Sequence, residues 1–232
     1  MTFAWERVKA DPGTILATVI VGMVLIWVVG FVMSFIAHVV SSVGVTATHR
    51  SSSGLPFELM PLSIGMASLS WAIDLVVTSF VMAGIMSFAL KVAKGLPYTF
   101  ADLFSGAPFF VSVLVANLIS GLAISIGLVF LIVPGVILMI GLSMTLPLIV
   151  DRGIGPIDAL TESWRLTDGN RANIFIFGLI AFGLVVAGAC ACGIGIFLVI
   201  PLLYIAHMYV YLKLTNQPVA VITQARPQSV AY

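Results

Sequence analysis

Long apolar runs separated by short polar segments make up most of the chain. A membrane interior about 30 Å thick needs roughly 20 apolar residues in a helix that rises about 1.5 Å per residue. Two of the runs are long enough for two crossings each, and the breaker residues at Pro134-Gly135 and Cys192-Gly193 divide them. The pattern therefore predicts an all-α fold with six membrane-spanning helices, over residues 14–40, 63–90, 109–133, 134–150, 173–190 and 194–214.

The composition also indicates a membrane environment. Of the 232 residues, 61% are hydrophobic and 8% are charged. An ordinary soluble domain carries about 25% charged residues, so this chain has too few polar residues to cover a soluble globule. The net charge of +1 provides no basic surface for nucleic acid. We expect the lipid bilayer to be a partner, and we expect no nucleic acid to be one.

The positions of lysine and arginine predict the orientation. With six spans, both chain ends lie on the same side of the membrane as the loops 91–108 and 151–172. That side holds nine of the ten basic residues, and Arg50 alone lies opposite. Because cytoplasmic loops carry the excess of Lys and Arg, we expect both termini in the cytoplasm, with residues 216–232 as a cytoplasmic tail. The nine are Arg7, Lys9, Lys91, Lys94, Arg152, Arg165, Arg171, Lys213 and Arg226.

Two of the predicted hairpins share a motif. Ile126-Gly127 is followed by an apolar run that ends at Pro134, and Ile194-Gly195 is followed by a similar run that ends at Pro201. Each motif lies about midway through its predicted hairpin. Self-similarity of this kind predicts that the two hairpins are structural repeats.

A short amphipathic segment precedes each of these hairpins on the cytoplasmic side. These segments cover residues 98–104 and 156–166, and residues 3–8 are a weaker third example. We therefore expect one membrane domain, 1–232, in which each unit is an interfacial helix followed by a helical hairpin. The three units cover approximately 1–90, 91–150 and 151–215.

The segment 156–166 has the pattern of a helix that lies at the membrane surface. Tryptophan at the level of the lipid headgroups is a common anchor. We expect one face toward the membrane and the other toward water. The first face carries Ile157, Leu160 and Trp164, with Leu166 near it, and the second carries Asp158, Glu162 and Arg165.

The first hairpin contains an inserted polar loop, residues 41–61, on the external side. It includes His49, Arg50 and Glu58 beside a serine-rich run. A flexible connector is one interpretation, and an external docking loop is the other.

Several motifs occur along the later part of the chain: Leu131-Ile-Val-Pro-Gly135, Val150-Asp-Arg-Gly-Ile-Gly-Pro-Ile-Asp-Ala-Leu160, Ser163-Trp-Arg-Leu166, Gly169-Asn170, Gly193-Ile-Gly195, Pro201 and Tyr209. In this combination the sequence resembles a widespread group of bacterial membrane proteins that includes the membrane domains of some glycerophosphoryl diester phosphodiesterases. The resemblance covers roughly residues 90–215 and implies a multi-span helical fold in a bacterial cytoplasmic (inner) membrane. In the phosphodiesterases the hydrolysis belongs to a separate soluble domain, and nothing in this sequence corresponds to that domain.

Asp74 is the one charged residue expected well inside a span. A carboxylate at the bilayer centre costs at least about 3 kcal/mol on insertion scales, so it should be neutral, paired or facing a wet interior. His207 lies at a similar distance from the external end of its own helix. We predict that Asp74 and His207 approach each other, either as a proton or cation site or as a structural hydrogen bond.

Other polar and small residues predict contacts between helices. Tyr204, His207 and Tyr211 form a polar stripe on one helix, and Asn117 requires a partner helix because its amide is costly in lipid. Small residues four apart allow close helix packing, within this chain or against another. Two such ridges are Ser79, Ala83 and Ser87, and Gly183, Ala187, Ala191 and Gly195.

No Ser/His/Asp arrangement, phosphate-binding loop or metal-ligand spacing is present in the sequence. Cys190 and Cys192 are interpreted as buried small residues. We therefore assign no catalytic, cofactor-binding or metal-binding residue, and we expect no cofactor.

Three functional hypotheses remain. The first is a non-catalytic scaffold or accessory subunit that binds other membrane subunits or a second copy of itself. The alternative is a small transporter or channel that uses Asp74 and His207. The third is a lipid-modifying membrane enzyme, which would need clustered His, Asp or Glu at the interface.

Overall fold

The computed structural model describes Trp5 and residues 12–50, 60–190 and 194–219. All regular structure in these residues is helical, which confirms the predicted fold class. Six stretches are long and apolar enough to cross a membrane. The elements in chain order are α2 (Pro12–Arg50), α3 (Met60–Lys94), the 3₁₀ helices η2 (Phe100–Phe104) and η3 (Ala107–Phe109), α4 (Phe110–Phe130), α5 (Ile132–Gly141), α6 (Thr145–Arg152), α7 (Pro156–Thr167), α8 (Arg171–Cys190) and α9 (Ile194–Leu214).

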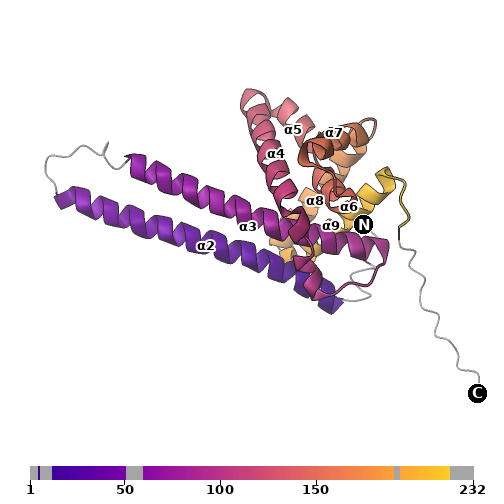
Figure 1. Ribbon diagram of the computed structural model, residues 1–232, viewed down its shortest axis with the longest axis horizontal. Helices are drawn as coiled ribbons and strands as arrows, with labels where there is room; N and C mark the ends of the chain where they lie inside the picture. The colour runs from indigo at the N-terminus through magenta and orange to yellow at the C-terminus, as the bar shows by residue number, and fades with distance from the viewer. Residues whose placement is uncertain (1–4, 6–11, 51–59, 191–193, 220–232) are drawn as a thin grey trace, which may run out of the picture.

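The first two helices form a hairpin that extends far beyond the other elements (Figure 1). At 39 residues, α2 is about 58 Å long, whereas a whole bilayer with its headgroups measures about 40–45 Å. The polar loop expected over 41–61 is therefore wrong at both ends, because α2 continues to Arg50 and α3 begins at Met60. Serine, threonine and histidine weaken a helix only slightly, so their presence does not end α2. Residues 51–59 lie outside the described part of the chain.

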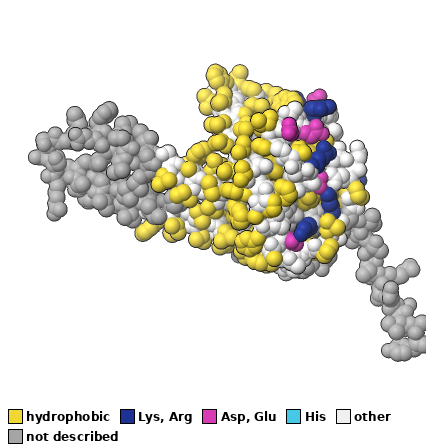
Figure 2. Space-filling view, in the orientation of Figure 1, with side chains coloured by type: hydrophobic (Ala, Val, Ile, Leu, Met, Phe, Trp, Pro, Cys, Tyr) yellow, Lys and Arg dark blue, Asp and Glu magenta, His cyan; other side chains and the backbone are white. Residues whose placement is uncertain are grey.

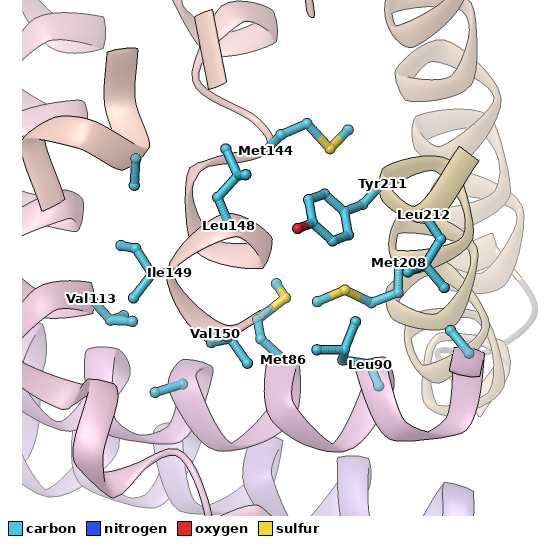
Figure 3. Close-up of a cluster of buried hydrophobic side chains, with 14 of the residues drawn as sticks. Met86, Leu90, Val113, Met144, Leu148, Ile149, Val150, Met208, Tyr211 and Leu212 are labelled. Carbon is cyan, nitrogen blue, oxygen red and sulfur yellow. The ribbon is translucent and has the colours of Figure 1, made fainter. Parts of the chain in front are cut away.

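The main hydrophobic core joins helices that are far apart in sequence. Met86 and Leu90 of α3 pack with Met208 and Leu212 of α9 and with Leu148 of α6 (Figure 3). A second cluster joins the first turns of α2 to the same pair of helices. It contains Ile15, Val19, Phe88, Val92 and Ile205. These contacts place α2, α3 and α9 side by side, with α3 and α9 running in the same direction.

Charged side chains gather at one end of the molecule, on the right of Figure 2. We call this region the charged end and define it by Lys91, Lys94, Asp102, Asp151 and Arg152. Lys91 pairs with Asp102 over 2.6 Å, which holds η2 against the last turns of α3. Leu103 of η2 is buried beside Val81 and Ile85. The predicted short segment near 98–104 is thus helical, although it is a 3₁₀ helix.

The fourth predicted span, 134–150, is interrupted. α5 ends at Gly141, and α6 begins at Thr145 after three residues in turns. Pro147 explains the break, because in a continuous helix its ring would clash with the carbonyl of Ser143 and it has no N–H to donate. In α6 it is the third residue, where an N–H would have no partner within the helix.

The predicted repeat motif falls at different places in the two later hairpins. Gly127 lies in α4, before the turn at Leu131, whereas Gly195 lies in α9, after the end of α8 at Cys190. The division of the long apolar runs near Pro134 and Cys192 agrees with these helix ends. The relation between three similar units stays a prediction, and residues 3–8 fall outside the described part apart from Trp5.

Candidate functional site

The break between α5 and α6 leaves backbone groups that other helices satisfy. Because Pro147 cannot donate, the carbonyl of Ser143 has no helical partner, and Nε2 of His207 lies 3.1 Å from this oxygen. A carbonyl oxygen only accepts, so the hydrogen in this contact belongs to Nε2. His207 comes from α9, and its ring also stands 6.4 Å from that of Phe177 in α8. One side chain therefore joins the broken segment to the last hairpin.

The amphipathic helix α7 provides hydrogen-bond partners for other backbone groups at the same break. Ser163 is fully buried, donates to the carbonyl of Gly141 over 2.8 Å and accepts the backbone N–H of Met144 over 3.1 Å. Thr167 also donates to the Gly141 carbonyl, at 3.3 Å. Non-helical backbone is tolerated at membrane depth only where such partners replace the lost helical bonds.

The inner face of α7 consists of small residues, which sequence reasoning did not identify. Ala159, Ser163 and Thr167 are buried, and Trp164 lies across Gly141 so closely that a Cβ there would stand 2.4 Å from the ring. The signal was present as a spacing of four between small residues. Ile157 is 67% exposed, whereas Trp164 of the same predicted face packs on Gly141, so the lipid-facing side of α7 stays a prediction.

Asp151, at the charged end, joins three parts of the chain. Its Oδ1 accepts from Nζ of Lys94 in α3 over 2.5 Å. Its Oδ2 accepts from the phenol of Tyr211 in α9 and from the amide of Gln217, which follows α9, both over 2.6 Å. The Asp151 side chain is 6% exposed. A nearly buried carboxylate with three donors is a strongly held group, because charged hydrogen bonds strengthen where water is excluded.

Asp151 was also missed by sequence reasoning. It immediately follows the apolar run of the fourth span and precedes Arg152, so the sequence alone assigns it to a solvated loop. Its importance depends on α3 and α9, which are distant in the chain. Arg152 itself pairs with Glu162 of α7 over 3.4 Å, so α6 and α7 are also linked at this end.

The predicted approach of Asp74 and His207 is wrong. Asp74 is exposed and lies 20 residues before Lys94, about 30 Å along α3 from the charged end. His207 lies six residues before Lys213, only about 9 Å from that end of α9. The prediction counted depth from the far ends of the two helices, but α3 has 35 residues and α9 has 21, so equal counts from those ends do not give equal levels. Asp74 therefore lies about 20 Å farther from the charged end than His207 does.

The other predicted contacts between helices are mostly confirmed. Tyr204 donates to the sulfur of Met82 over 3.4 Å, so together with His207 and Tyr211 the stripe faces neighbouring helices. Asn117 of α4 donates to Oγ of Ser79 in α3 over 3.1 Å.

The two small-residue ridges differ. Ser79, Ala83 and Ser87 are buried, as predicted. Gly183 has open space around it, and it is Gly188 that meets Gly195 closely, with the Gly195 carbonyl carbon 3.0 Å from a Cβ built there. Within this chain α8 therefore meets α9 through Gly188, and contact of the Gly183 ridge with another chain stays a prediction. Cys190 is exposed and not buried, and Cys192 lies outside the described residues.

The arrangement has the character of a structural joint. Within the described residues no group of three or more His, Cys, Asp and Glu could hold a metal ion. Asp151, Ser163 and His207 each bond to groups of this chain. The described contacts thus connect α3, α6, α7 and α9.

Three curated mycobacterial proteins are similar to the chain over nearly its whole length. They are uncharacterized protein Rv2560 and uncharacterized protein MT2637 of two Mycobacterium tuberculosis strains, and uncharacterized protein Mb2590 of Mycobacterium bovis. Each is 24% identical over 233 residues, which cover 98% of this chain and 71% of the relative. No family model matches the chain, and no solved structure matches it.

Proposed function

We propose that this chain is a non-catalytic integral membrane protein that serves as a scaffold or accessory subunit of a larger membrane complex. The observation that carries the proposal is the α2–α3 hairpin. The apolar run of α2 ends at Val40, yet the helix continues for ten more residues, about 15 Å, to Arg50. We call the polar end of this projecting hairpin, residues 41–50 and 60–62, the arm. A long helical pair that stands away from its own bundle suits contact with another subunit.

The polar side chains of the bundle also support this role. Asp151, His207 and Ser163 hold α3, α6, α7 and α9 together through bonds within the chain. A rigid joint of this kind fixes the base from which the arm projects, and rigid elements position binding surfaces more precisely than loops do.

We further propose a bacterial cytoplasmic membrane, with both termini in the cytoplasm. The similarity to mycobacterial proteins supports the bacterial membrane. The gathering of basic residues at one end supports the orientation of the termini. Membership of the group that includes phosphodiesterase membrane domains stays a proposal resting on the motifs of residues 131–209. A cysteine introduced at Ser52 should react with an impermeant reagent from outside the cell, and one at Ser105 should not. The reverse pattern would overturn the orientation.

The alternative is a small transporter or channel. The interrupted α5–α6 segment favours it, because transporters place broken helices at their binding sites. The separation of Asp74 from His207 removes the pair on which this hypothesis depended, and the carbonyls of Gly141 and Ser143 at the break are occupied.

Co-purification in a mild detergent tests the main proposal. We expect the full chain to retain a stoichiometric membrane partner. A variant in which residues 41–61 are replaced by a short Gly-Ser linker should lose that partner while it keeps the melting temperature of the bundle. A full-length chain that purifies alone and moves solute across liposome membranes would favour the transporter.

A further inference from the structure

The turn between α4 and α5 is both apolar and exposed. Six consecutive residues, Leu128 to Val133, contain no polar side chain, and Val129 and Phe130 are 85% and 80% exposed. We call residues 128–133 the tip. A turn that emerged on the far side of a bilayer would place this apolar surface in water, at a cost of about 25 cal/mol per Å².

The length of α5 limits how far the tip can lie from the charged end. α5 contains 10 residues, so Leu131 lies about 15 Å from Gly141 at most. Gly141 is held against α7 by Ser163 and by the Trp164 ring.

The contacts of nearby charged residues indicate the depth of Gly141 relative to the charged end. The guanidinium of Arg171, the first residue of α8, lies 4.1 Å from the centre of the Trp164 ring. α7 also carries Glu162, which pairs with Arg152. Gly141 therefore lies near the level at which α8 begins. From that level α8 runs for 20 residues, about 30 Å, whereas α5 reaches only about half as far.

We propose that α4 and α5 form a re-entrant hairpin, which enters the bilayer from the charged end, turns near its centre and returns to the same side. The tip then contacts the acyl chains of that leaflet, and α7 lies above it at the headgroups. Four helices, α2, α3, α8 and α9, cross the membrane. The chain ends remain on one side, because a hairpin that returns removes two crossings.

The geometry of the hairpin fits this placement. α4 is about 30 Å long and ends at the tip, so a tip near the bilayer centre requires α4 to be oblique to the membrane normal. Figure 1 shows α4 running across the direction of α3. The turn also pairs much of its own backbone: Leu131 donates to Gly127 over 3.0 Å, and Gly135 donates to Leu131 over 3.4 Å. Pro134 has no N–H to leave unpaired. Backbone inside lipid requires such internal partners.

Depth measurement in liposomes tests the proposal. The full-length protein is reconstituted with a single cysteine carrying a nitroxide label. The test variant replaces Cys190 and Cys192 with Ser and introduces Phe130→Cys or, as a second tip position, Val129→Cys. The matched control keeps Cys190, at the end of α8, and replaces only Cys192. A third variant, with Thr161→Cys on the exposed side of α7, marks the charged surface.

Collision of the label with oxygen, which concentrates at the bilayer centre, is compared with collision with a water-soluble nickel chelate. We expect both tip labels to be the most oxygen-accessible of the set and the least nickel-accessible. The Cys190 label should lie nearer the aqueous phase, and the Thr161→Cys label should be nickel-accessible. The proposal would be overturned if the tip labels were as accessible to nickel as the Cys190 label. It would also be overturned if the unlabelled tip cysteines reacted with an impermeant maleimide added on the far side of the membrane.

Discussion

The phenol of Tyr211 donates a hydrogen bond to Oδ2 of Asp151 over 2.6 Å, and this contact connects the end of α9 to the end of α6. Tyr211 is fully buried, so its hydroxyl must find a partner within the protein. The other carboxylate oxygen of Asp151, Oδ1, accepts a hydrogen bond from Nζ of Lys94. The charged end thus holds the last helix by a chain of contacts that begins at α3.

Removing the Tyr211 hydroxyl tests this connection. Tyr211→Phe should lower the free energy of unfolding in detergent by about 1.5–3 kcal/mol, the range for a hydrogen bond to a charged group. The control is Tyr204→Phe in the same helix, where the hydroxyl meets only the weak sulfur acceptor of Met82. Equal losses for the two variants would show that the Asp151 contact has no special weight.

Lys94→Met should destabilise the protein more than loss of an exposed lysine does. The side chains of Lys94 and Asp151 are 26% and 6% exposed, so the variant leaves a nearly buried carboxylate without its cation. We expect a loss of about 2–3 kcal/mol, below the roughly 3–5 kcal/mol for fully buried pairs. Lys213→Met, at an exposed position of α9, is the control. Adding Asp151→Asn to Lys94→Met should restore part of the loss, whereas additive losses would exclude coupling.

The role of His207 depends on Pro147, and a double-mutant cycle measures that dependence. His207→Phe alone should cost about 1–3 kcal/mol, because the half-buried Ser143 carbonyl loses its donor. Pro147→Ala supplies a backbone N–H that can take that place. In its background the His207→Phe substitution should therefore cost less. The unfolding free energies of the four proteins give the coupling, and an unchanged cost would mean that His207 acts by packing alone.

Ser163→Ala should loosen the contact between α7 and the helix break. The buried N–H of Met144 and the carbonyl of Gly141 both lose a partner, at a cost of about 1–3 kcal/mol. Thr161→Ala, on the exposed side of the same helix, should change stability little. Hydrogen exchange at Met144 is the specific readout, since it should accelerate in the first variant and not in the second.

The sequence alone was sufficient for the all-helical class and for the division of the two long apolar runs, but not for the break at residues 142–144. Run length and breaker residues placed α8 and α9 within a few residues of the observed bounds, and the basic residues marked the charged end. The polar stripe of α9 was correctly assigned to contacts with other helices. These features depend on local composition, on a helical period and on the thickness of a bilayer, which are all visible along one chain.

Only the tertiary structure decided depth and partnership. Asp74 was placed level with His207 because the sequence does not show that α3 has 35 residues and α9 only 21. Asp151 was read as part of a loop because Lys94, Tyr211 and Gln217 reach it from distant segments. Hydrophobicity sets how many residues prefer lipid, but the packing of one helix against another sets their level in the membrane and which polar groups meet.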